Sequence, residues 1–206
     1  MSSNPLSLNL CGVALQNPVI AASGTFGFGR EYAERMDVSR LGGISGKGLT
    51  LRGSAGNRGE RICETPSGLL NSIGLENPGV KHFVEHEAAY LRSLGPAVLC
   101  NLGGHCEEDY LEGASLLNEA DIDFLELNIS CPNVKAGGMA FGLLPDTAAE
   151  ITKKVKAVTR HPLMVKLSPN APDLVAVARA CEAAGADALS LVNTFQIGRA
   201  SCRERV

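Results

Sequence analysis

The chain has 206 residues, of which 45% are hydrophobic and 20% charged, and its formal net charge is −3. This apolar content suffices for one sizeable core, while a weakly acidic chain without a basic block is a poor partner for nucleic acid or an anionic membrane surface. No apolar run approaches the roughly 20 residues that span a bilayer. Seven scattered cysteines, never spaced Cys-x-x-Cys, argue against a disulfide framework or a zinc ribbon, and we predict no metal site. With no signal-peptide pattern at the start, the expected compartment is the reducing cytoplasm.

The first predicted element is a polar hairpin over Leu6–Leu15 that turns at Cys11-Gly12. Apolar strands and helical patterns then alternate, and a second hairpin is predicted over Arg52–Pro66, after the second strand. The predicted strands are Val19–Ala21, Ile44–Ser45, Val98–Leu102, Phe124–Leu127, Leu163–Leu167 and Leu189–Val192. The predicted helices are Val80–Leu94, Glu107–Glu119, Asp146–Thr159 and Leu174–Ala184, with Asp146 and Asp173 as N-caps and Gly95 and Gly185 as stops.

These strands are apolar without alternation, which is typical of parallel strands buried on both faces. Each strand ends in polar residues or glycine: Ser23-Gly24, Lys47-Gly48, Asn101, Asn128, Lys166 and Asn193-Thr194. In a βα barrel all strand C-termini open on one face, where active sites are built, whereas an open doubly wound sheet uses only its switch point. Six contributing strands favour an α/β fold of the TIM (β/α)8-barrel type.

A complete barrel has eight strands and typically about 250 residues. We therefore expect an incomplete barrel of about six βα units, forming one domain over residues 1–196. Residues 197–206 introduce three arginines without periodicity. We interpret them as a non-native tail that resembles a translated sequencing adapter, although a polar C-terminal tail is the other interpretation. The natural protein is then expected to continue past residue 196.

Two loops carry the strongest candidate residues. The segment Asn71–Leu75 precedes Asn77, which fits a helix N-cap before a helix start at Pro78. Asn71 lies too far upstream to cap that helix, so a binding role is at least as plausible. Cys131 follows the strand end at Asn128, and a thiol with a pKa of about 8.5 needs only modest electropositive help to act as a base.

The remaining cysteines and cations are interpreted more simply. Cys11, Cys100 and Cys181 are expected to be small buried hydrophobes, and His105 and Cys106 solvated loop residues. Lys166 closes an apolar run, so its ammonium is expected to face an anion or an electron-rich ring, and Lys47 raises the same expectation. The glycine-rich segments 23–29 and 42–48 fit neither the dinucleotide-binding nor the Walker spacing.

Taken together, Ser23-Gly24, Lys47-Gly48, Asn71–Leu75, Asn128-Ile-Ser-Cys131-Pro-Asn133, Lys166 and Asn193-Thr194 resemble the dihydroorotate dehydrogenase family, in its catalytic FMN subunit. The resemblance runs from about Leu6 to Phe195. Residues 133–142 are similar to the NAD-linked class 1B subgroup. The resemblance implies FMN-dependent oxidation of dihydroorotate to orotate in pyrimidine (UMP) biosynthesis.

Site residues are carried over from this resemblance. Cys131 would remove the C5 proton of dihydroorotate while hydride passes from C6 to the flavin, with Lys166 stabilising negative charge on the reduced ring. Substrate would be bound by Lys47, Asn71, Ser72, Ile73, Gly74, Leu75, Asn128, Asn193 and Thr194. FMN would be bound by Ser23, Lys47, Gly48, Asn101, Asn128, Lys166 and Val192.

The subgroup further implies a partner subunit carrying FAD and a 2Fe-2S cluster, with electrons passing to NAD and two copies of each subunit forming a heterotetramer. The FMN phosphate loops of the family would lie beyond this chain, and the first and sixth strands would have unpaired edges. The 206-residue polypeptide is therefore expected to fold marginally and retain little flavin. Two alternatives stay open: a related flavin barrel enzyme that acts on dihydropyrimidines, and a fragment without activity.

Overall fold

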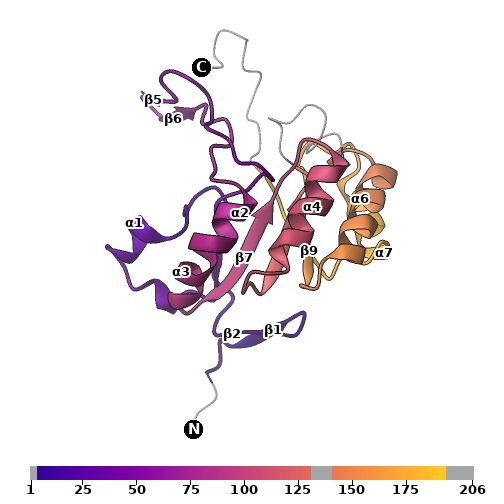
Figure 1. Ribbon diagram of the computed structural model, residues 1–206, viewed down its shortest axis with the longest axis horizontal. Coiled ribbons are helices and arrows are strands. Elements are labelled where there is room, and N and C mark those ends of the chain that lie inside the picture. Colours follow the sequence, from indigo (N-terminus) through magenta and orange to yellow (C-terminus); the bar gives the residue numbers. More distant parts are fainter. Residues whose placement is uncertain (1–3, 131–140, 194–206) are drawn as a thin grey trace.

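The structure is a computed structural model that describes residues 4–130 and 141–193. Its centre is a six-stranded parallel sheet in the order β10-β9-β8-β7-β4-β3. These strands are β3 (Ile20–Ala21), β4 (Gly43–Ser45), β7 (Ala97–Leu102), β8 (Phe124–Asn128), β9 (Leu163–Lys166) and β10 (Ala188–Ser190). The sheet curls with helices along its outer side (Figure 1), so the described residues form an incomplete TIM barrel, as the sequence predicts.

Each strand pairs with the next parallel strand along the sequence, as repeated βα units require. Within the described residues, β3 and β10 each pair on one side only, which confirms the expectation of open edges at the first and sixth strands. The predicted strands agree with the observed ones to within two residues at either end. The largest difference is at β10, which ends at Ser190 rather than Val192.

The described helical segments are α1 (Arg30–Ala33), the 3₁₀ turn η1 (Val38–Arg40), α2 (Val80–His82), the π-helical turn η2 (Phe83–Glu87), α3 (Ala88–Ser93), α4 (Glu107–Leu117), α6 (Pro145–Val158) and α7 (Leu174–Ala183). The helix predicted over Val80–Leu94 is therefore present but contains a π-helical turn. Gly95 and Gly185 follow their helices with φ of 100° and 102°, as expected for helix stops.

Two of the predicted helix starts are wrong and one is right. Asp173 caps α7 by accepting a hydrogen bond from the Ala176 N–H at 2.8 Å. Asp146 does not cap α6, because Pro145 occupies the first turn before it and Asp146 contributes only a negative charge near the helix N-terminus. The helix after Asn77 begins at Val80 rather than at Pro78.

The two faces of the sheet pack against different partners. Alternate strand residues such as Val98 and Leu125 face the helices and form the larger apolar core. Residues of opposite parity, including Leu99 and Phe124, face the inside of the curled sheet and pack with Leu15. Leu15 belongs to the N-terminal hairpin of β1 (Leu8–Leu10) and β2 (Val13–Leu15), which therefore covers the strand N-termini.

The N-terminal hairpin turns at Cys11 and Gly12, which have φ of 50° and 89°, as predicted. The prediction that Cys11 is buried is wrong: Cys11 is exposed, and its Sγ lies 3.0 Å from the carbonyl oxygen of Asp187. Cys100 and Cys181 are buried, and His105 and Cys106 are exposed, as expected.

The second hairpin lies later in the chain than predicted. Its strands are β5 (Ile62–Thr65) and β6 (Gly68–Asn71), whereas the prediction was Arg52–Pro66. Glycine and charge drew the prediction to the residues before β5, but there only Ser54 forms an isolated bridge, to Asn77. The hairpin projects from the same side of the molecule as the strand C-termini (Figure 1).

Candidate functional site

The inner face of the sheet changes from apolar to polar along the strands. Register places Leu99 opposite Phe124, and two residues later Asn101 opposite Glu126. The next pair, Asn128 with Lys166, continues the same parity toward the strand C-termini. The apolar end is therefore closed by the N-terminal hairpin, and the polar end forms the candidate site, as expected for a βα barrel.

A continuous polar network occupies this end, buried except for the partly buried Asn193, and we define it as Ser45, Glu126, Asn101, Asn128, Ser130 and Asn193. Glu126 Oε2 accepts from Ser45 Oγ at 2.6 Å and from Asn101 Nδ2 at 2.7 Å. Asn128 Nδ2 donates to Asn101 Oδ1 at 3.1 Å. Ser130 donates to Asn128 Oδ1 from Oγ at 2.7 Å and from its backbone N–H at 3.2 Å. Asn193 Nδ2 donates to Ser130 Oγ at 3.0 Å.

This network joins three of the predicted site residues, Asn101, Asn128 and Asn193. Asn101 is 0% exposed and Asn128 8%, so their amides need protein partners. The Tyr110 hydroxyl of α4 also donates to the Asn128 carbonyl at 3.0 Å, which fixes the backbone at this strand end. The network is therefore held from both the sheet and the helix layer.

Lys166 lies beside this network. It is 8% exposed and stands in register with Asn128 on the neighbouring strand. Among residues 4–130 and 141–193, its ammonium has no hydrogen-bonding or ion-pair partner. A buried cation without a partner is costly, so the site is suited to an anionic or electron-rich group.

Gly48 is the point where two predicted segments meet. A Cβ at Gly48 would lie 2.9 Å from Asn101 Oδ1 and 3.5 Å from Leu75 Cδ1. The candidate substrate loop Asn71–Leu75 therefore lies against the end of the second parallel strand, next to the polar network. A side chain at this position would collide with the Asn101 amide, so glycine is required where the backbone passes Asn101.

The substrate loop is held by asparagines on both sides. Asn57 Nδ2 donates to the Ser72 carbonyl at 3.0 Å and to Ser72 Oγ at 2.9 Å. Asn77, predicted as a helix cap, instead donates to the Leu75 carbonyl at 2.8 Å. Asn71 itself is exposed at the end of β6, while residues 72–75 are partly buried.

The other predicted site residues are placed less directly. Lys47 is partly buried, and its backbone N–H donates to the Gly27 carbonyl at 2.9 Å, in the loop that also holds Ser23. Val192 is partly buried and packs against the larger core. Within the described part of the chain, no hydrogen bond or ion pair joins Ser23 or Asn71 to the polar network. Cys131 and Thr194 lie outside the described residues.

Sequence reasoning missed Glu126, Ser45 and Ser130. Glu126 is 3% exposed, and its signal was an acidic residue inside the apolar run Phe124–Leu127. Cys100 lies on the opposite face of the sheet. The pKa of its thiol is raised mainly by burial and to a lesser extent by the nearby negative charge of Glu126. Cys100 is therefore an inert, protonated thiol near neutral pH.

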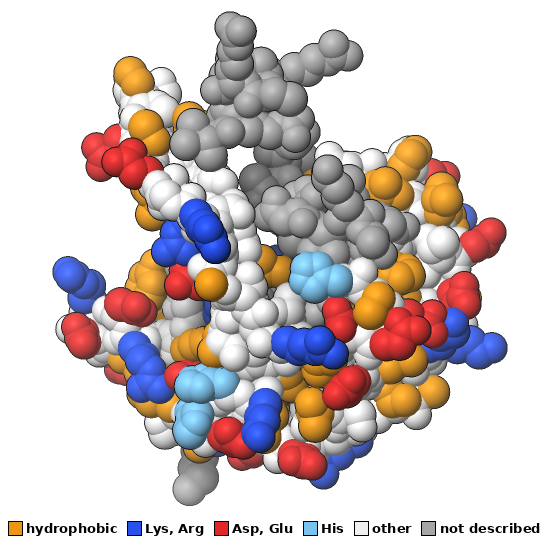
Figure 2. Space-filling view, turned by 45° about the horizontal axis from the view of Figure 1, so that its top comes forward, with side chains coloured by type: hydrophobic (Ala, Val, Ile, Leu, Met, Phe, Trp, Pro, Cys, Tyr) orange, Lys and Arg blue, Asp and Glu red, His pale blue; other side chains and the backbone are white. Residues whose placement is uncertain are grey.

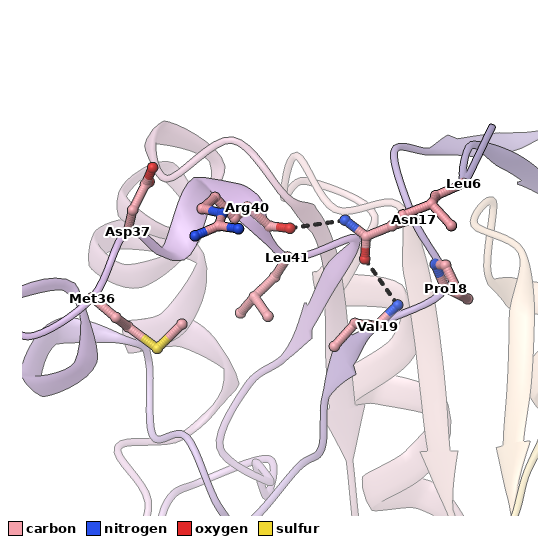
Figure 3. Close-up of a pocket in the computed structure, with 8 residues that line it drawn as sticks. All are labelled: Leu6, Asn17, Pro18, Val19, Met36, Asp37, Arg40 and Leu41. Carbon is pink, nitrogen blue, oxygen red and sulfur yellow. Dashed lines mark hydrogen bonds between the residues drawn. The ribbon is translucent and has the colours of Figure 1, made fainter. Parts of the chain in front are cut away.

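A separate pocket of about 390 Å³ lies at the opposite end of the strands. Val19 and Leu41, which line it, precede β3 and β4, and the Asn17 amide bridges the Arg40 carbonyl and the Val19 N–H (Figure 3). Its lining is mostly apolar and offers no ring of strand-end donors. We therefore assign the candidate site to the polar end of the sheet.

The charge pattern and the described side chains also bear on other kinds of site. Acidic and basic side chains are interspersed on the face seen in Figure 2, without a large patch of one sign. Among the described residues, no three His, Cys, Asp or Glu side chains are close enough to hold a metal ion. None of the helices in that part of the chain combines the length and apolar character needed to cross a membrane.

Comparison with known proteins decides the family. A sequence model described as dihydroorotate dehydrogenase matches residues 5–204. This chain belongs to the dihydroorotate dehydrogenase family. The resemblance drawn from the strand-end residues is thus confirmed, and the TIM-barrel type of the family agrees with the curled parallel sheet.

Curated relatives of this family are similar over most of the chain. One from Petrotoga mobilis is 52% identical over 188 residues, covering 91% of this chain and 63% of the relative. One from Alkaliphilus metalliredigens is 50% identical over 195 residues, covering 95% of this chain and 65% of the relative. One from Geobacillus kaustophilus is 50% identical over 193 residues, covering 93% of this chain and 62% of the relative. All three are named dihydroorotate dehydrogenase B (NAD(+)), catalytic subunit, and this chain spans less than two thirds of their length.

Proposed function

We propose that this chain provides the catalytic subunit of an NAD-linked dihydroorotate dehydrogenase, which oxidises dihydroorotate to orotate in pyrimidine biosynthesis. The observation that carries the proposal is the polar network beside the buried Lys166 at the strand C-termini, in a member of this family. The named activity of the relatives in Petrotoga and Alkaliphilus supports the same reaction.

The proposed substrate is a flat ring with alternating amide donors and acceptors and one carboxylate. Amide side chains suit the ring edges, because each offers one donor group and one acceptor. Asn128 and Asn193 are the described candidates, and Asn71 and Thr194 remain predictions. Lys47 is the proposed cation for the carboxylate, with residues 72–75 closing over the ring.

Cys131 is the proposed base. It would take the proton from C5 of dihydroorotate while a hydride leaves C6, so that a C5–C6 double bond forms and the substrate loses two electrons. In the sequence Cys131 follows Asn128, the last residue of β8, by three residues.

FMN is the proposed cofactor, and it would supply the acceptor for the hydride. The described residues fit such a group: Lys166 is a buried cation suited to an electron-rich ring, and Gly48 leaves the backbone beside Asn101 without a side chain. The residues proposed to hold it are Ser23, Lys47, Gly48, Asn101, Asn128, Lys166 and Val192.

The printed name of the relatives, catalytic subunit, supports a partner chain. We propose a partner that carries FAD and a 2Fe-2S cluster and passes electrons to NAD, in a heterotetramer with two copies of each chain, located in the cytoplasm. We also propose that the barrel domain covers residues 1–196 and that residues 197–206 are not native.

The test uses the protein at the length of its relatives, called the full-length protein below. The purified protein is expected to carry FMN and to lose its flavin absorbance anaerobically when dihydroorotate is added, but not with dihydrouracil, which lacks the carboxylate. Cys131→Ala should retain FMN yet lose almost all of the bleaching rate. A protein that binds FMN but is bleached equally by both compounds would overturn the substrate assignment, and equal rates in Cys131→Ala would move the base elsewhere.

A further inference from the structure

Glu126 is a buried carboxylate with no role in the function proposed above. It lies on the inner face of β8, is 3% exposed, and accepts hydrogen bonds from Ser45 and Asn101 at 2.6 and 2.7 Å. Such short contacts fit charge-assisted hydrogen bonds to an ionised group. Burying a carboxylate costs several kcal/mol before its hydrogen bonds are counted, so hydrophobic packing alone does not account for this residue.

The hydrogen bonds of the network all run in one sense, with each amide donating toward Glu126, and the Glu126 carboxylate fixes that sense at one end. An ionised carboxylate can only accept hydrogen bonds, so Asn101 must turn its Nδ2 toward Glu126 and its Oδ1 away. Asn101 Oδ1 then faces Asn128 Nδ2 at 3.1 Å. Asn128 Oδ1 accepts from the Ser130 hydroxyl and from the Ser130 backbone N–H, which can only donate. The carboxylate and this N–H therefore hold the two amides in one orientation from opposite ends of the network.

We propose that Glu126 is a positioning residue: together with the Ser130 N–H at the other end of the network, its buried carboxylate fixes the orientation of the Asn101 and Asn128 amides and thereby determines which ring edge the site accepts. The inference rests on the proposed function, because Asn128 is the amide offered to the pyrimidine. Asn128 Oδ1 already accepts two hydrogen bonds from Ser130, so the fixed amide offers a ring its second Nδ2 hydrogen. A ring that presents an acceptor at this point gains a hydrogen bond, and a ring turned over so that a donor lies there does not.

The test is Glu126→Gln, which keeps size and shape but removes the charge and adds a donor. In the full-length protein we expect the dissociation constant for orotate to rise by about tenfold or more, with little change in the unfolding midpoint. Glu87→Gln is the matched control, because it makes the same substitution at another buried carboxylate, whose partner Arg30 lies outside the network. It should change orotate affinity by less than about twofold.

A second readout does not depend on substrate. Protein labelled with ¹⁵N-asparagine should show slowly exchanging side-chain amide protons for Asn101 and Asn128 in the wild type, and faster exchange or doubled signals in Glu126→Gln. Glu126→Asp keeps an acceptor-only charge, so it should retain the single set of signals. If Glu126→Gln does not fold, doubled signals in Glu126→Asp would overturn the positioning role, since the charge is still present in that variant.

The outcomes separate the two claims. Wild-type amide signals in Glu126→Gln, orotate affinity unchanged by that substitution, or an equal loss in Glu87→Gln would overturn the positioning role while leaving the proposed function intact. If the wild type does not bind orotate but Glu126→Gln still releases the amide protons, the positioning role stands and the proposed function fails.

Discussion

Asn77 Nδ2 donates to the carbonyl of Leu75 at 2.8 Å, and Leu75 holds a φ of 54° that non-glycine residues rarely adopt. The same side chain accepts from the Thr50 N–H at 2.9 Å and the Gly79 N–H at 3.0 Å through Oδ1. One buried amide therefore ties the candidate substrate loop to the segment after β4 and to the start of α2. It holds a strained backbone in place beside the site.

Asn77→Ala should lower the free energy of unfolding by about 2–4 kcal/mol, because two buried backbone N–H groups lose their acceptor. Denaturant titration of the full-length protein measures this. Asn57→Ala is the control: it removes exposed hydrogen bonds to Ser72 in the same loop and should cost less than about 1 kcal/mol. Equal losses in the two variants would contradict the role given to Asn77.

Gly48→Ala should reduce FMN retention in the full-length protein by at least about tenfold. The new Cβ would lie 2.9 Å from Asn101 Oδ1, so either the amide or the backbone must move. Gly68→Ala, in β6, meets no atom within 4 Å and should leave FMN retention unchanged. Flavin absorbance per protein after gel filtration gives the comparison; full retention in Gly48→Ala would show that Gly48 does not bound the cofactor site.

Lys166→Met should raise the stability of the cofactor-free protein and weaken FMN binding. The substitution removes the ammonium of a residue that is only 8% exposed and has no ion-pair partner among the described residues, while keeping most of its apolar stem. Thermal unfolding of the apoprotein and titration with FMN provide the two measurements. A destabilised apoprotein, or unchanged FMN affinity, contradicts the proposal that Lys166 is kept for a ligand.

His161 should make the protein less stable in mild acid. Burial lowers the pKa of its imidazole below the ordinary 6.5; Arg160 acts in the same direction, while the hydrogen bond of Nε2 to the Leu117 carbonyl and the charge of Asp123 oppose it. The unfolded chain therefore takes up a proton first as pH falls, and the free energy of unfolding decreases below about pH 6.5.

His161→Gln keeps an N–H donor for the Leu117 carbonyl but cannot titrate in this range. Between about pH 7 and pH 5 the free energy of unfolding of the wild type should therefore fall more than that of the variant. Denaturant midpoints at several pH values test this. All other titratable groups are the same in both proteins, so the difference between the two profiles reports on His161. Parallel pH profiles would show that His161 titrates normally in the folded state.

Much of the fold could be predicted because it depends on patterns that repeat. Apolar runs such as Phe124–Leu127 and Leu163–Leu167 have to be buried on both faces, and Gly95 and Gly185 mark the ends of two helices. The second hairpin was misplaced because glycine and charge indicate a loop but not its pairing partner. Ile62 pairs with Asn71, a register that depends on contacts across the hairpin rather than on local composition.

The site was predicted only in part, for a similar reason. Strand-end residues such as Asn101 and Lys166 are visible in the sequence because polar groups interrupt apolar runs. The role of Glu126 is not, because it depends on the alternation that turns it toward Asn101 on the neighbouring strand. Asn77 looked like a helix cap because caps and loop ties use the same side chain, and only the tertiary structure separates them.

The most direct test of the central claim is a crystal structure of the full-length protein with FMN and orotate. We predict that orotate lies at the strand C-termini within hydrogen-bonding distance of Asn128 and Asn193, with Lys166 against the flavin ring. Orotate bound in the apolar pocket between Val19 and Leu41, or Lys166 directed away from the flavin, would contradict the account.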